Sequence, residues 1–332
     1  MPRIGMNPSR GKKSEYTPAR VTVAVLTYVP HHLGYFKNRF DVLRACLESI
    51  LVNTAEPFDL MVFDNGSSQE VVEYLKTLYA EKKIDFLVLS SQNIGKIGAL
   101  QFISRSAPGE VIAYSDDDVF FLPGWLERHL EIMDTYPRVG LVTGFYIKSH
   151  MDESISSTMK FSAQDGVIAE RVDLVDEVLS LHYIEQMGRT MQQYQKELEG
   201  LQDVRLTYQG ITTFVSAGHH QFVCFREALL KALPNEWTFN LMGLMRQLDA
   251  SIDQMGLLRL STALPATRLL GNLIDPKSAD IIKGFGIEIE GAEPVREPAN
   301  WLKKFYSIPF IQRLAYSVYE RLFNIINLNN YN

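Results

Sequence analysis

Residues 111–118 read VIAYSDDD, a short apolar run that ends in three consecutive carboxylates. Four comparable apolar runs occupy residues 21–27, 59–64, 86–89 and 139–145. Between them, apolar side chains recur at helical spacing, as in Phe40, Leu43, Leu47 and Ile50. Short apolar runs that alternate with amphipathic helices are typical of a largely parallel sheet flanked by helices. The sequence therefore predicts an α/β fold.

Composition places the chain among ordinary globular proteins and excludes several classes. Its 332 residues are 46% hydrophobic, which is enough to bury a full core. A net charge of -6 gives no reason to expect a nucleic-acid partner. The two cysteines, Cys46 and Cys224, lie far apart and show neither disulfide-framework nor zinc-ligand spacing. Without a membrane-length apolar run or a signal core, a cytoplasmic location is expected.

The pattern predicts three segments. Residues 1–19 lack apolar periodicity and read as a flexible lead-in. Residues 20–285 form the α/β domain, with a helical insertion at about 149–205, where the strand rhythm breaks. Residues 286–332 carry an apolar stripe at helical spacing and form a helical C-terminal extension.

Polar residues follow four of the predicted strands. In open α/β sheets ligands bind beyond the carboxyl ends of the strands, so these residues are expected to line one rim. They are Thr27, Tyr28, Asp64, Asn65, Gly95, Lys96, Asp116, Asp117 and Asp118. Taken singly, residues 64–67 are also a good turn sequence. The pair Gly95 and Lys96 offers close backbone approach and a cation for phosphate, but P-loop and dinucleotide spacings are missing.

The three carboxylates repel one another unless a cation joins them, and a divalent metal is the natural partner. Oxygen ligands suit Mg²⁺ or Mn²⁺, usually with substrate phosphates completing the shell. If the segment stays extended, Asp116 and Asp118 point to one side and Asp117 to the other. The alternative is a solvated acidic turn that precedes the helix expected after residues 123–126.

In order and spacing, these pieces resemble the family 2 glycosyltransferases of the GT-A fold. The matching segments are residues 21–27, 62–67, 93–100 and 109–118. The resemblance implies a GT-A (Rossmann-like) mixed, mostly parallel sheet and a nucleoside-diphosphate sugar as donor. It also implies that Asp116 and Asp118 bind the metal and the ribose-diphosphate part of the donor, with Asp117 as a further possible ligand. By the same resemblance, Asp64 or Asn65 recognises the base, and Thr27 and Tyr28 contact the nucleoside.

The same family carries a distal acidic residue that deprotonates the acceptor hydroxyl in inverting transfer. Its nearest match here is Asp249, one turn after Met245 on a helix expected at about 240–255, with Asp253 as second candidate. Residues 211–225 read as a strand, in which His219 and His220 would face opposite ways. The family's late metal-binding histidine has no counterpart in residues 267–272, where Arg268 is an alternative cation for the diphosphate.

The sequence thus predicts a metal-dependent inverting glycosyltransferase in surface polysaccharide or glycoconjugate biosynthesis, with a glycan or lipid-linked acceptor. Two alternatives stay open. One is a sugar-nucleotide nucleotidyltransferase, which shares the sheet and acidic site, and the other is a non-catalytic sugar-nucleotide-binding protein. The C-terminal stripe is expected to pack on the domain or on a second copy, or to touch the inner face of a membrane.

Overall fold

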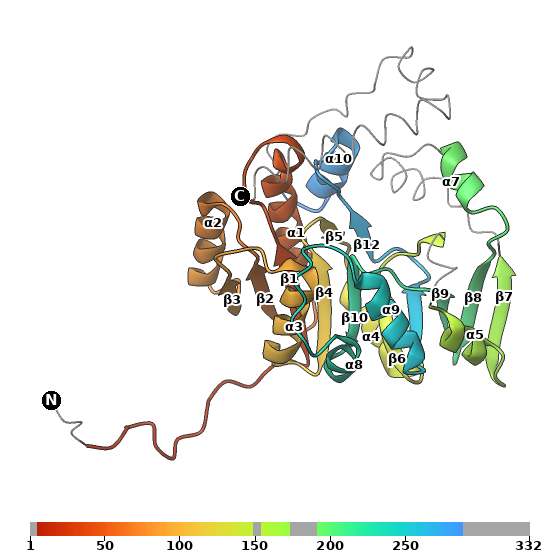
Figure 1. Ribbon diagram of the computed structural model, residues 1–332, viewed down its shortest axis with the longest axis horizontal. Coiled ribbons are helices and arrows are strands. Elements are labelled where there is room, and N and C mark those ends of the chain that lie inside the picture. Colours follow the sequence, from red (N-terminus) through yellow and green to blue (C-terminus); the bar gives the residue numbers. More distant parts are fainter. Residues whose placement is uncertain (1–4, 149–153, 173–190, 288–332) are drawn as a thin grey trace, which may run out of the picture. The chain divides into compact units, whose positions relative to one another are not determined.

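The computed structural model describes residues 5–148, 154–172 and 191–287, all within one compact unit of the chain, residues 1–292. Its centre is a sheet of ten strands in the order β3-β2-β1-β4-β10-β6-β11-β9-β8-β7 (Figure 1). The strands are β1 (Val21–Thr27), β2 (Phe58–Asp64), β3 (Phe86–Leu89), β4 (Val111–Asp116), β6 (Val139–Thr143), β7 (Val167–Val172), β8 (Asp203–Tyr208), β9 (Ile211–Val215), β10 (Gln221–Phe225) and β11 (Leu258–Thr262). Two further strands, β5 (Val119–Phe121) and β12 (Thr267–Leu269), pair with each other.

The sheet is mixed, and one strand has a special place in it. The β3-β2-β1-β4 half is parallel, and so is the β6-β11 pair. Between them β10 runs antiparallel to both β4 and β6. The start of β10 therefore lies beside the end of β4, with Gln221 opposite Ser115. This pairing brings a late part of the chain to the acidic segment.

Helices cover both faces of the sheet, as the sequence predicts. One face carries α1 (Arg39–Asn53), α2 (Gln69–Ala80), α4 (Trp125–Thr135) and α5 (Ser156–Ser162). The other carries α3 (Gly95–Ser106), α8 (Arg226–Ala232) and α9 (Met245–Gln254). The remaining described helices are η1 (Gly34–Phe36), α7 (Met191–Glu197) and α10 (Pro276–Gly284). The expected mixed sheet with flanking helices is confirmed.

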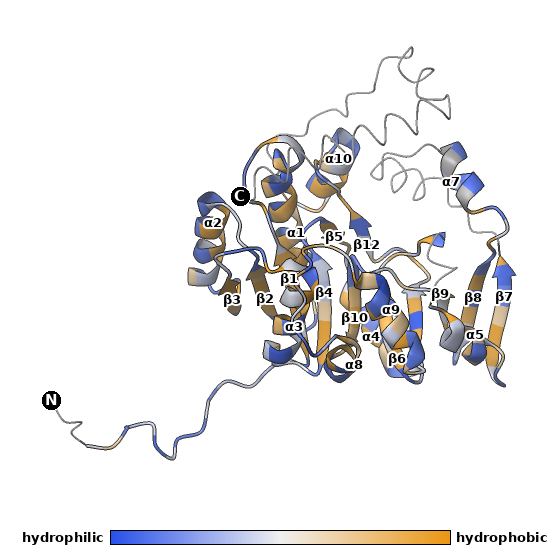
Figure 2. Ribbon diagram, in the orientation of Figure 1, coloured by the Kyte–Doolittle hydropathy of each residue, from blue (hydrophilic) through white to orange (hydrophobic). Residues whose placement is uncertain are grey.

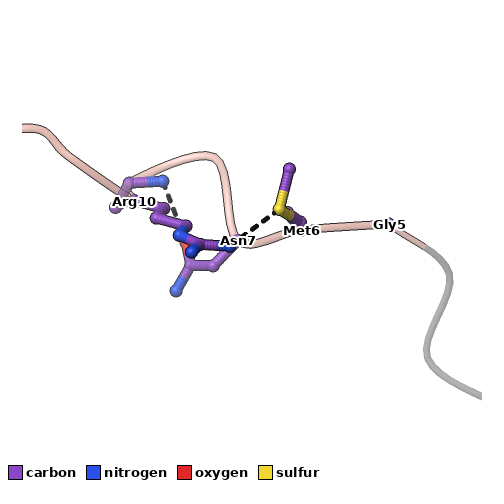
Figure 3. Close-up of a pocket in the computed structure, with 5 residues that line it drawn as sticks. Gly5, Met6, Asn7 and Arg10 are labelled. Atoms are coloured by element: carbon purple, nitrogen blue, oxygen red, sulfur yellow. Dashed lines mark hydrogen bonds between the residues drawn. The ribbon is translucent and has the colours of Figure 1, made fainter.

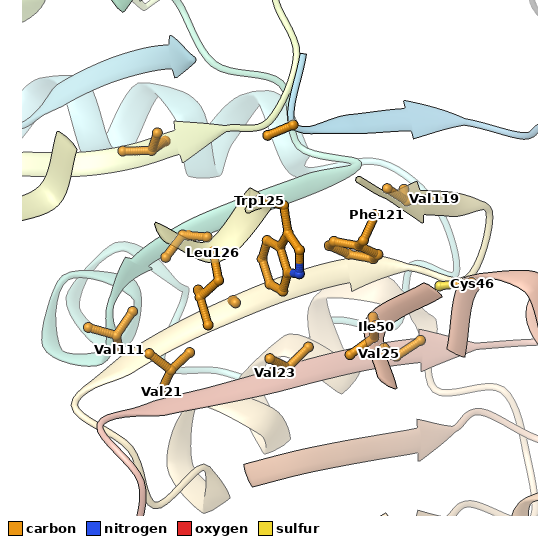
Figure 4. Close-up of a cluster of buried hydrophobic side chains, with 14 of the residues drawn as sticks. Val21, Val23, Val25, Cys46, Ile50, Val111, Val119, Phe121, Trp125 and Leu126 are labelled. Carbon is orange, nitrogen blue, oxygen red and sulfur yellow. The ribbon is translucent and has the colours of Figure 1, made fainter. Parts of the chain in front are cut away.

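Alternation along β1 divides the core into two clusters. Val21, Val23 and Val25 pack on the α1 side, whereas Ala24 and Leu26 pack on the α3 side. Because both faces of the sheet are covered, β1 is buried along its whole length, and the inner strands are largely apolar (Figure 2). On the first face, the indole of Trp125 packs beside Phe121 and above the valines of β1, as Figure 4 shows.

The expected helical insertion also contains strands. Within its described residues it contains α5 and α7 but also β7 and β8, which extend the sheet beyond β9. Four of the six β7 residues are exposed, so no apolar alternation marks the strand in the sequence. The helical pattern expected within residues 173–190 and the extension 288–332 lie outside the described residues.

The described part of the lead-in, residues 5–19, contains neither helix nor strand. Its residues Gly5, Met6, Asn7 and Arg10 line a hollow together with Ser9 (Figure 3). All five belong to one short segment, and none is a candidate site residue. Among the described helices, none combines the length and apolar character that crossing a bilayer requires.

A buried histidine ties α4 to the sheet. The His129 ring is fully buried, with Nδ1 2.6 Å from the Trp125 carbonyl oxygen and Nε2 3.3 Å from Gln221 Nε2. The Gln221 side-chain oxygen accepts from the Gly144 N–H, so the three groups form one chain of contacts. Burial lowers the pKa of His129 to about 4, because the charged ring loses its hydration.

This shift predicts a pH-dependent stability. Between pH 6.5 and 4 the unfolded chain binds a proton at His129 that the folded chain excludes, so the stabilisation present above pH 6.5 is lost as pH falls through that window. The free energy of unfolding should therefore decrease between pH 7 and pH 4. We expect this decrease to be up to about 3 kcal/mol larger in the native protein than in His129→Asn. Urea titrations across this range measure the difference, and parallel pH slopes would contradict it.

Candidate functional site

The acidic segment turns immediately after β4. Asp116 is the last strand residue, and Asp117 and Asp118 form a tight turn before β5. The segment does not stay extended, so the condition under which Asp116 and Asp118 would point to one side is not met. Instead Asp117 and Asp118 share one cation, Arg39, while Asp116 contacts another, Lys96.

Arg39 is the first residue of α1 and is almost fully buried. Its guanidinium pairs with Asp117 Oδ1 and with Asp118 Oδ2, the latter at 3.0 Å, and donates to the Gly271 carbonyl oxygen at 2.9 Å. Asp117 also accepts from the Thr27 hydroxyl at 2.6 Å. Burial raises the pKa of Asp117 to about 6, although the Arg39 charge acts in the opposite direction.

Within the acidic segment, Asp118 has unused hydrogen-bonding capacity. Its Oδ1 atom is buried and has no hydrogen-bond partner in the described part of the structure. A buried carboxylate oxygen left unpaired is costly unless something completes its coordination. With Asp116 nearby in the chain, the donors are hard oxygens of the kind that Mg²⁺ and Mn²⁺ prefer, so these residues fit a divalent metal. No group of three or more metal-ligating side chains is preassembled among residues 5–148, 154–172 and 191–287.

Asp116 lies in a strongly cationic setting. The Lys96 ammonium is 2.7 Å from Asp116 Oδ2, and the Tyr114 hydroxyl donates to Oδ1 at 2.7 Å. His220 Nδ1 lies 3.7 Å from the same Oδ2 atom. Burial acts to raise the pKa of Asp116, but Lys96 and His220 outweigh it and hold the pKa well below its usual range.

Lys96 reaches this position because the turn before it is tight. Gly95 has φ +77°, and a Cβ at this position would collide with the Asn240 carbonyl oxygen. Lys96 N–H donates to the Leu241 carbonyl oxygen at 3.3 Å, so the loop before α9 lies directly on the start of α3. A glycine is required here by both backbone angle and space.

The proposed base-reading pair is deeply buried. Asp64 and Asn65 are 1% and 3% exposed. The Asp64 carboxylate accepts from the backbone N–H groups of Gly66 and Ser67, at 3.3 and 3.2 Å. Asn65 Oδ1 accepts from Ile94 N–H at 2.9 Å. Both side chains thus fix the turns that follow β2 and β3, and base recognition by either stays a prediction.

The predicted strand over 211–225 is interrupted, which corrects the expectation for the two histidines. Ser216 has φ +95°, and residues 216–220 are not in a strand. The ring centroids of His219 and His220 lie 5.2 Å apart with planes 35° apart, so the two rings lie side by side. The break allows His219 to contact Asp249 while His220 approaches Asp116.

The α9 helix begins at Met245, later than predicted, because Gly243 and Leu244 adopt left-handed backbone angles. Asp249 lies on its buried side and is 5% exposed. Its Oδ2 atom is 3.3 Å from His219 Nδ1, and its Oδ1 atom is 3.2 Å from the Nη2 atom of buried Arg259. The second candidate, Asp253, instead accepts from Ser157 N–H at 2.7 Å and holds α5.

The structure therefore brings together most of the predicted residues and adds others that the sequence did not single out. Lys96 connects the acidic segment to the segment that carries the histidines. Its ammonium contacts Asp116 and also donates to the His219 carbonyl oxygen at 3.1 Å. Arg39 and Arg259 were missed because each begins or lies within an apolar element and carries no motif of its own. Arg268, on β12, has its Nε and Nη2 atoms buried without a hydrogen-bond partner in the described structure.

The chain is an open α/β protein, a class that binds ligands beyond the carboxyl ends of its strands, and the acidic end of β4 lies at such an edge. The family model "Glycosyl transferase family 2" matches residues 35–204, more than half of the chain. The chain belongs to glycosyl transferase family 2.

Curated relatives match a shorter part. An uncharacterised glycosyltransferase of Bacillus subtilis is 30% identical over 116 residues, which are 35% of this chain and 39% of the relative. Another, from Rickettsia bellii, is 28% identical over 116 residues, 35% of this chain and 15% of the relative. The chain thus covers well under two thirds of the length of either relative.

Solved structures also match the chain, at low sequence identity. Staphylococcus aureus TarS, residues 1–349, is 15% identical with a TM-score of 0.43, covering 82% of this chain and 67% of that one. The mannosyltransferase PcManGT of Pyrobaculum calidifontis, solved with GDP-Man and Mn²⁺, is 22% identical with a TM-score of 0.34, covering 42% of this chain and 40% of that one.

The buried Arg39 ion pairs predict a large stability effect. Arg39→Met removes the cation from two carboxylates and leaves Asp117 buried without compensation, so we expect a loss of about 3–5 kcal/mol in the free energy of unfolding at neutral pH. The loss should be smaller near pH 5, because the Asp117 carboxyl takes up a proton there and no longer carries an uncompensated charge. Urea unfolding measures both values.

Two further variants control this test. Arg44→Met, on the same helix but more exposed, should change stability by less than about 0.5 kcal/mol. Arg39→Met combined with Asp117→Asn should recover part of the loss, because the uncompensated charge is gone. An Arg39→Met variant as stable as the native protein would contradict the ion-pair assignment.

Proposed function

We propose that this protein is a metal-dependent glycosyltransferase that moves a sugar from a nucleoside-diphosphate sugar to an acceptor hydroxyl with inversion at the anomeric carbon. The observation that carries the proposal is the acidic end of β4 in a family 2 chain, where one buried oxygen of Asp118 has no hydrogen-bond partner among the described residues. Surface polysaccharide or glycoconjugate synthesis is the proposed setting.

On the donor side, Asp116 and Asp118 are the proposed metal-binding residues. The metal, when bound, neutralises charge on the leaving diphosphate. Arg39 and Lys96 hold the two carboxylates in place before the metal arrives. Lys96 and Arg268 are the fixed cations proposed to meet the diphosphate. Two buried guanidinium nitrogens of Arg268, Nε and Nη2, have no hydrogen-bond partner among the described residues, and such donors favour an anion.

The nucleoside is proposed to bind along the ends of β1 and β2. Thr27 is fully buried and holds Asp117, whereas Tyr28 is partly exposed and packs edge-on against Phe36. Tyr28 is therefore the better placed of the two to contact a nucleoside directly. Asp64 and Asn65 accept hydrogen bonds from the turns that follow β2 and β3. They are proposed to recognise the base by holding these turns in place.

On the acceptor side, the proton is proposed to leave toward Asp249. This carboxylate lies on the same rim as the acidic segment, because Lys96 contacts both Asp116 and the backbone of its neighbour His219. General-base assistance requires a group within hydrogen-bond reach of the acceptor hydroxyl. The 3.3 Å contact between Asp249 Oδ2 and His219 Nδ1 supports this proposal.

A donor screen tests the proposed activity. Incubation with UDP-glucose, UDP-N-acetylglucosamine or GDP-mannose and Mn²⁺ should raise the melting temperature and release nucleoside diphosphate. Release of pyrophosphate from a nucleoside triphosphate and a sugar phosphate would instead indicate a nucleotidyltransferase. Metal-dependent donor binding without any hydrolysis or transfer would indicate a non-catalytic binding protein.

Asp118→Ala should abolish turnover, because the proposed metal site loses a ligand, while Arg39 keeps its pairing with Asp117 and the fold persists. Nucleoside diphosphate release and Mn²⁺ binding by calorimetry measure the loss. The matched control is Asp134→Ala, which removes a half-exposed carboxylate paired with Arg20 and should leave both quantities unchanged. Near-normal sugar transfer by the Asp118 variant would rule out this assignment.

Asp249→Asn should retain donor binding and lose transfer. The amide oxygen still faces Arg259, so the fold should persist, but the negative charge beside His219 is gone. Donor binding is measured by thermal shift with Mn²⁺ and the donor, and transfer by product formation. Undiminished transfer would move proton removal to another part of the site.

A further inference from the structure

We propose that three loops at the carboxyl edge of the sheet form a surface that docks on an anionic lipid bilayer. Residues 28–38 follow β1, residues 237–246 lead into α9, and residues 263–268 follow β11. We call these three segments the edge loops. The proposal goes beyond sugar transfer, because it concerns the surface on which the protein works. It is carried by the exposure, the placement and the charge of the edge loops.

The most exposed large apolar side chains gather in the edge loops. Among the described residues, six such side chains are more than 60% exposed, and one of them, Met6, belongs to the lead-in. The other five are Leu33, Tyr35, Phe239, Met242 and Leu264. Several exposed apolar groups on one part of a surface mark an interaction site. At 92% and 83% exposure, Phe239 and Met242 project outward, which suits a fluid apolar medium better than a preformed pocket.

The edge loops share one edge of the sheet although they lie far apart in the sequence. Strands β1, β4, β6 and β11 run in the same direction, so their carboxyl ends lie together. Leu33 and Tyr35 follow β1, and Leu264 lies two residues beyond the end of β11. The acidic end of β4 lies at this edge too. The apolar side chains and the candidate site therefore belong to the same edge.

The loop before α9 is held along α3 by two sets of contacts. The buried Gln101 side chain donates through Nε2 to the carbonyl oxygens of Pro234 and Glu236, at 2.5 and 2.8 Å. At the start of α3, Lys96 N–H donates to the Leu241 carbonyl oxygen at 3.3 Å. Between these contacts the backbone runs along α3 to the carboxyl edge (Figure 1). A backbone that is already held in place loses little conformational freedom when its side chains bind.

The charge of the edge loops differs from that of the whole chain. The chain carries 39 acidic and 33 basic residues, yet the edge loops contain no acidic residue. Their charged residues are Lys37, Arg246 and Arg268, of which Lys37 and Arg246 are exposed. Apolar and aromatic side chains accompanied by Lys and Arg bind the interface of membranes that contain anionic lipids. This complementarity favours an anionic bilayer as the partner.

Docking at this edge has a consequence for the acceptor. The acidic end of β4 would lie close to the lipid headgroups, so an acceptor attached to a lipid could reach it without leaving the bilayer. This consequence rests on the proposed glycosyltransferase function, whereas the docking itself does not.

Vesicle flotation of the full chain tests the docking surface. The vesicles contain phosphatidylcholine alone or phosphatidylcholine with about one third phosphatidylglycerol. We expect the native protein to float with the anionic vesicles and to bind less as salt is added. Phe239→Ser combined with Met242→Ser should lower the vesicle affinity by about tenfold or more, because two apolar side chains no longer enter the interface.

The matched control removes two exposed apolar side chains elsewhere. Tyr79 on α2 and Ile168 on β7 are 52% and 60% exposed and lie outside the edge loops. Tyr79→Ser combined with Ile168→Ser should bind vesicles like the native protein. Thermal unfolding of both double variants should match the native protein, since all four side chains are exposed.

A dye placed on the chain locates the contact. Both native cysteines are buried, so Met242→Cys gives one accessible thiol for an environment-sensitive fluorophore. Ile168→Cys serves as the reference. The emission of the dye at position 242 should shift to the blue on anionic vesicles, and that of the reference should stay unchanged.

Two outcomes would overturn the proposal. One is a native protein that does not bind the anionic vesicles. The other is undiminished binding by the Phe239 and Met242 double variant together with an unshifted dye at position 242, which would assign attachment to another part of the chain. A native protein that floats as expected but releases no nucleoside diphosphate from any donor would support docking and contradict the proposed function.

Discussion

The site depends on how the protein holds three carboxylates together at the end of one strand. Their mutual repulsion is balanced by two cations that come from different helices, Arg39 from α1 and Lys96 from α3. Because these helices cover opposite faces of the sheet, the acidic turn is clamped from both sides. The same clamp ties β1 to the turn through Thr27 and ties residue 271 to it through Arg39.

Much of the fold follows from the local pattern of apolar and polar residues. The strands at Val21–Thr27 and Phe86–Leu89 have the predicted bounds. Val21–Thr27 is buried along its whole length, and a short apolar run of this kind has few alternatives to a central strand. The exposed strand β7 was missed, since a strand that buries little apolar surface leaves no alternation in the sequence. The start of α9 was placed too early, because a left-handed Leu244 gives no compositional signal.

The sequence predicted many residues of the candidate site, but not which of them contact one another. Strand-end reasoning found Asp116, Asp118 and Lys96, because polar residues after buried strands are conspicuous. It missed Arg39, whose role comes from long-range contacts at a helix start. It also predicted opposite directions for His219 and His220, since nothing in the sequence shows the break at Ser216.

The antiparallel insertion of β10 has a consequence for how the chain acquires this site during synthesis. Until residues 221–225 emerge from the ribosome, β4 has a partner on one side only, and its other edge presents unpaired backbone groups. The acidic turn therefore exists for a time without the histidines that later join it. Pairing over such a separation in sequence is slow to form. The pairing of β10 thus closes an exposed, association-prone edge of β4 and brings the two histidines to the acidic turn in the same event.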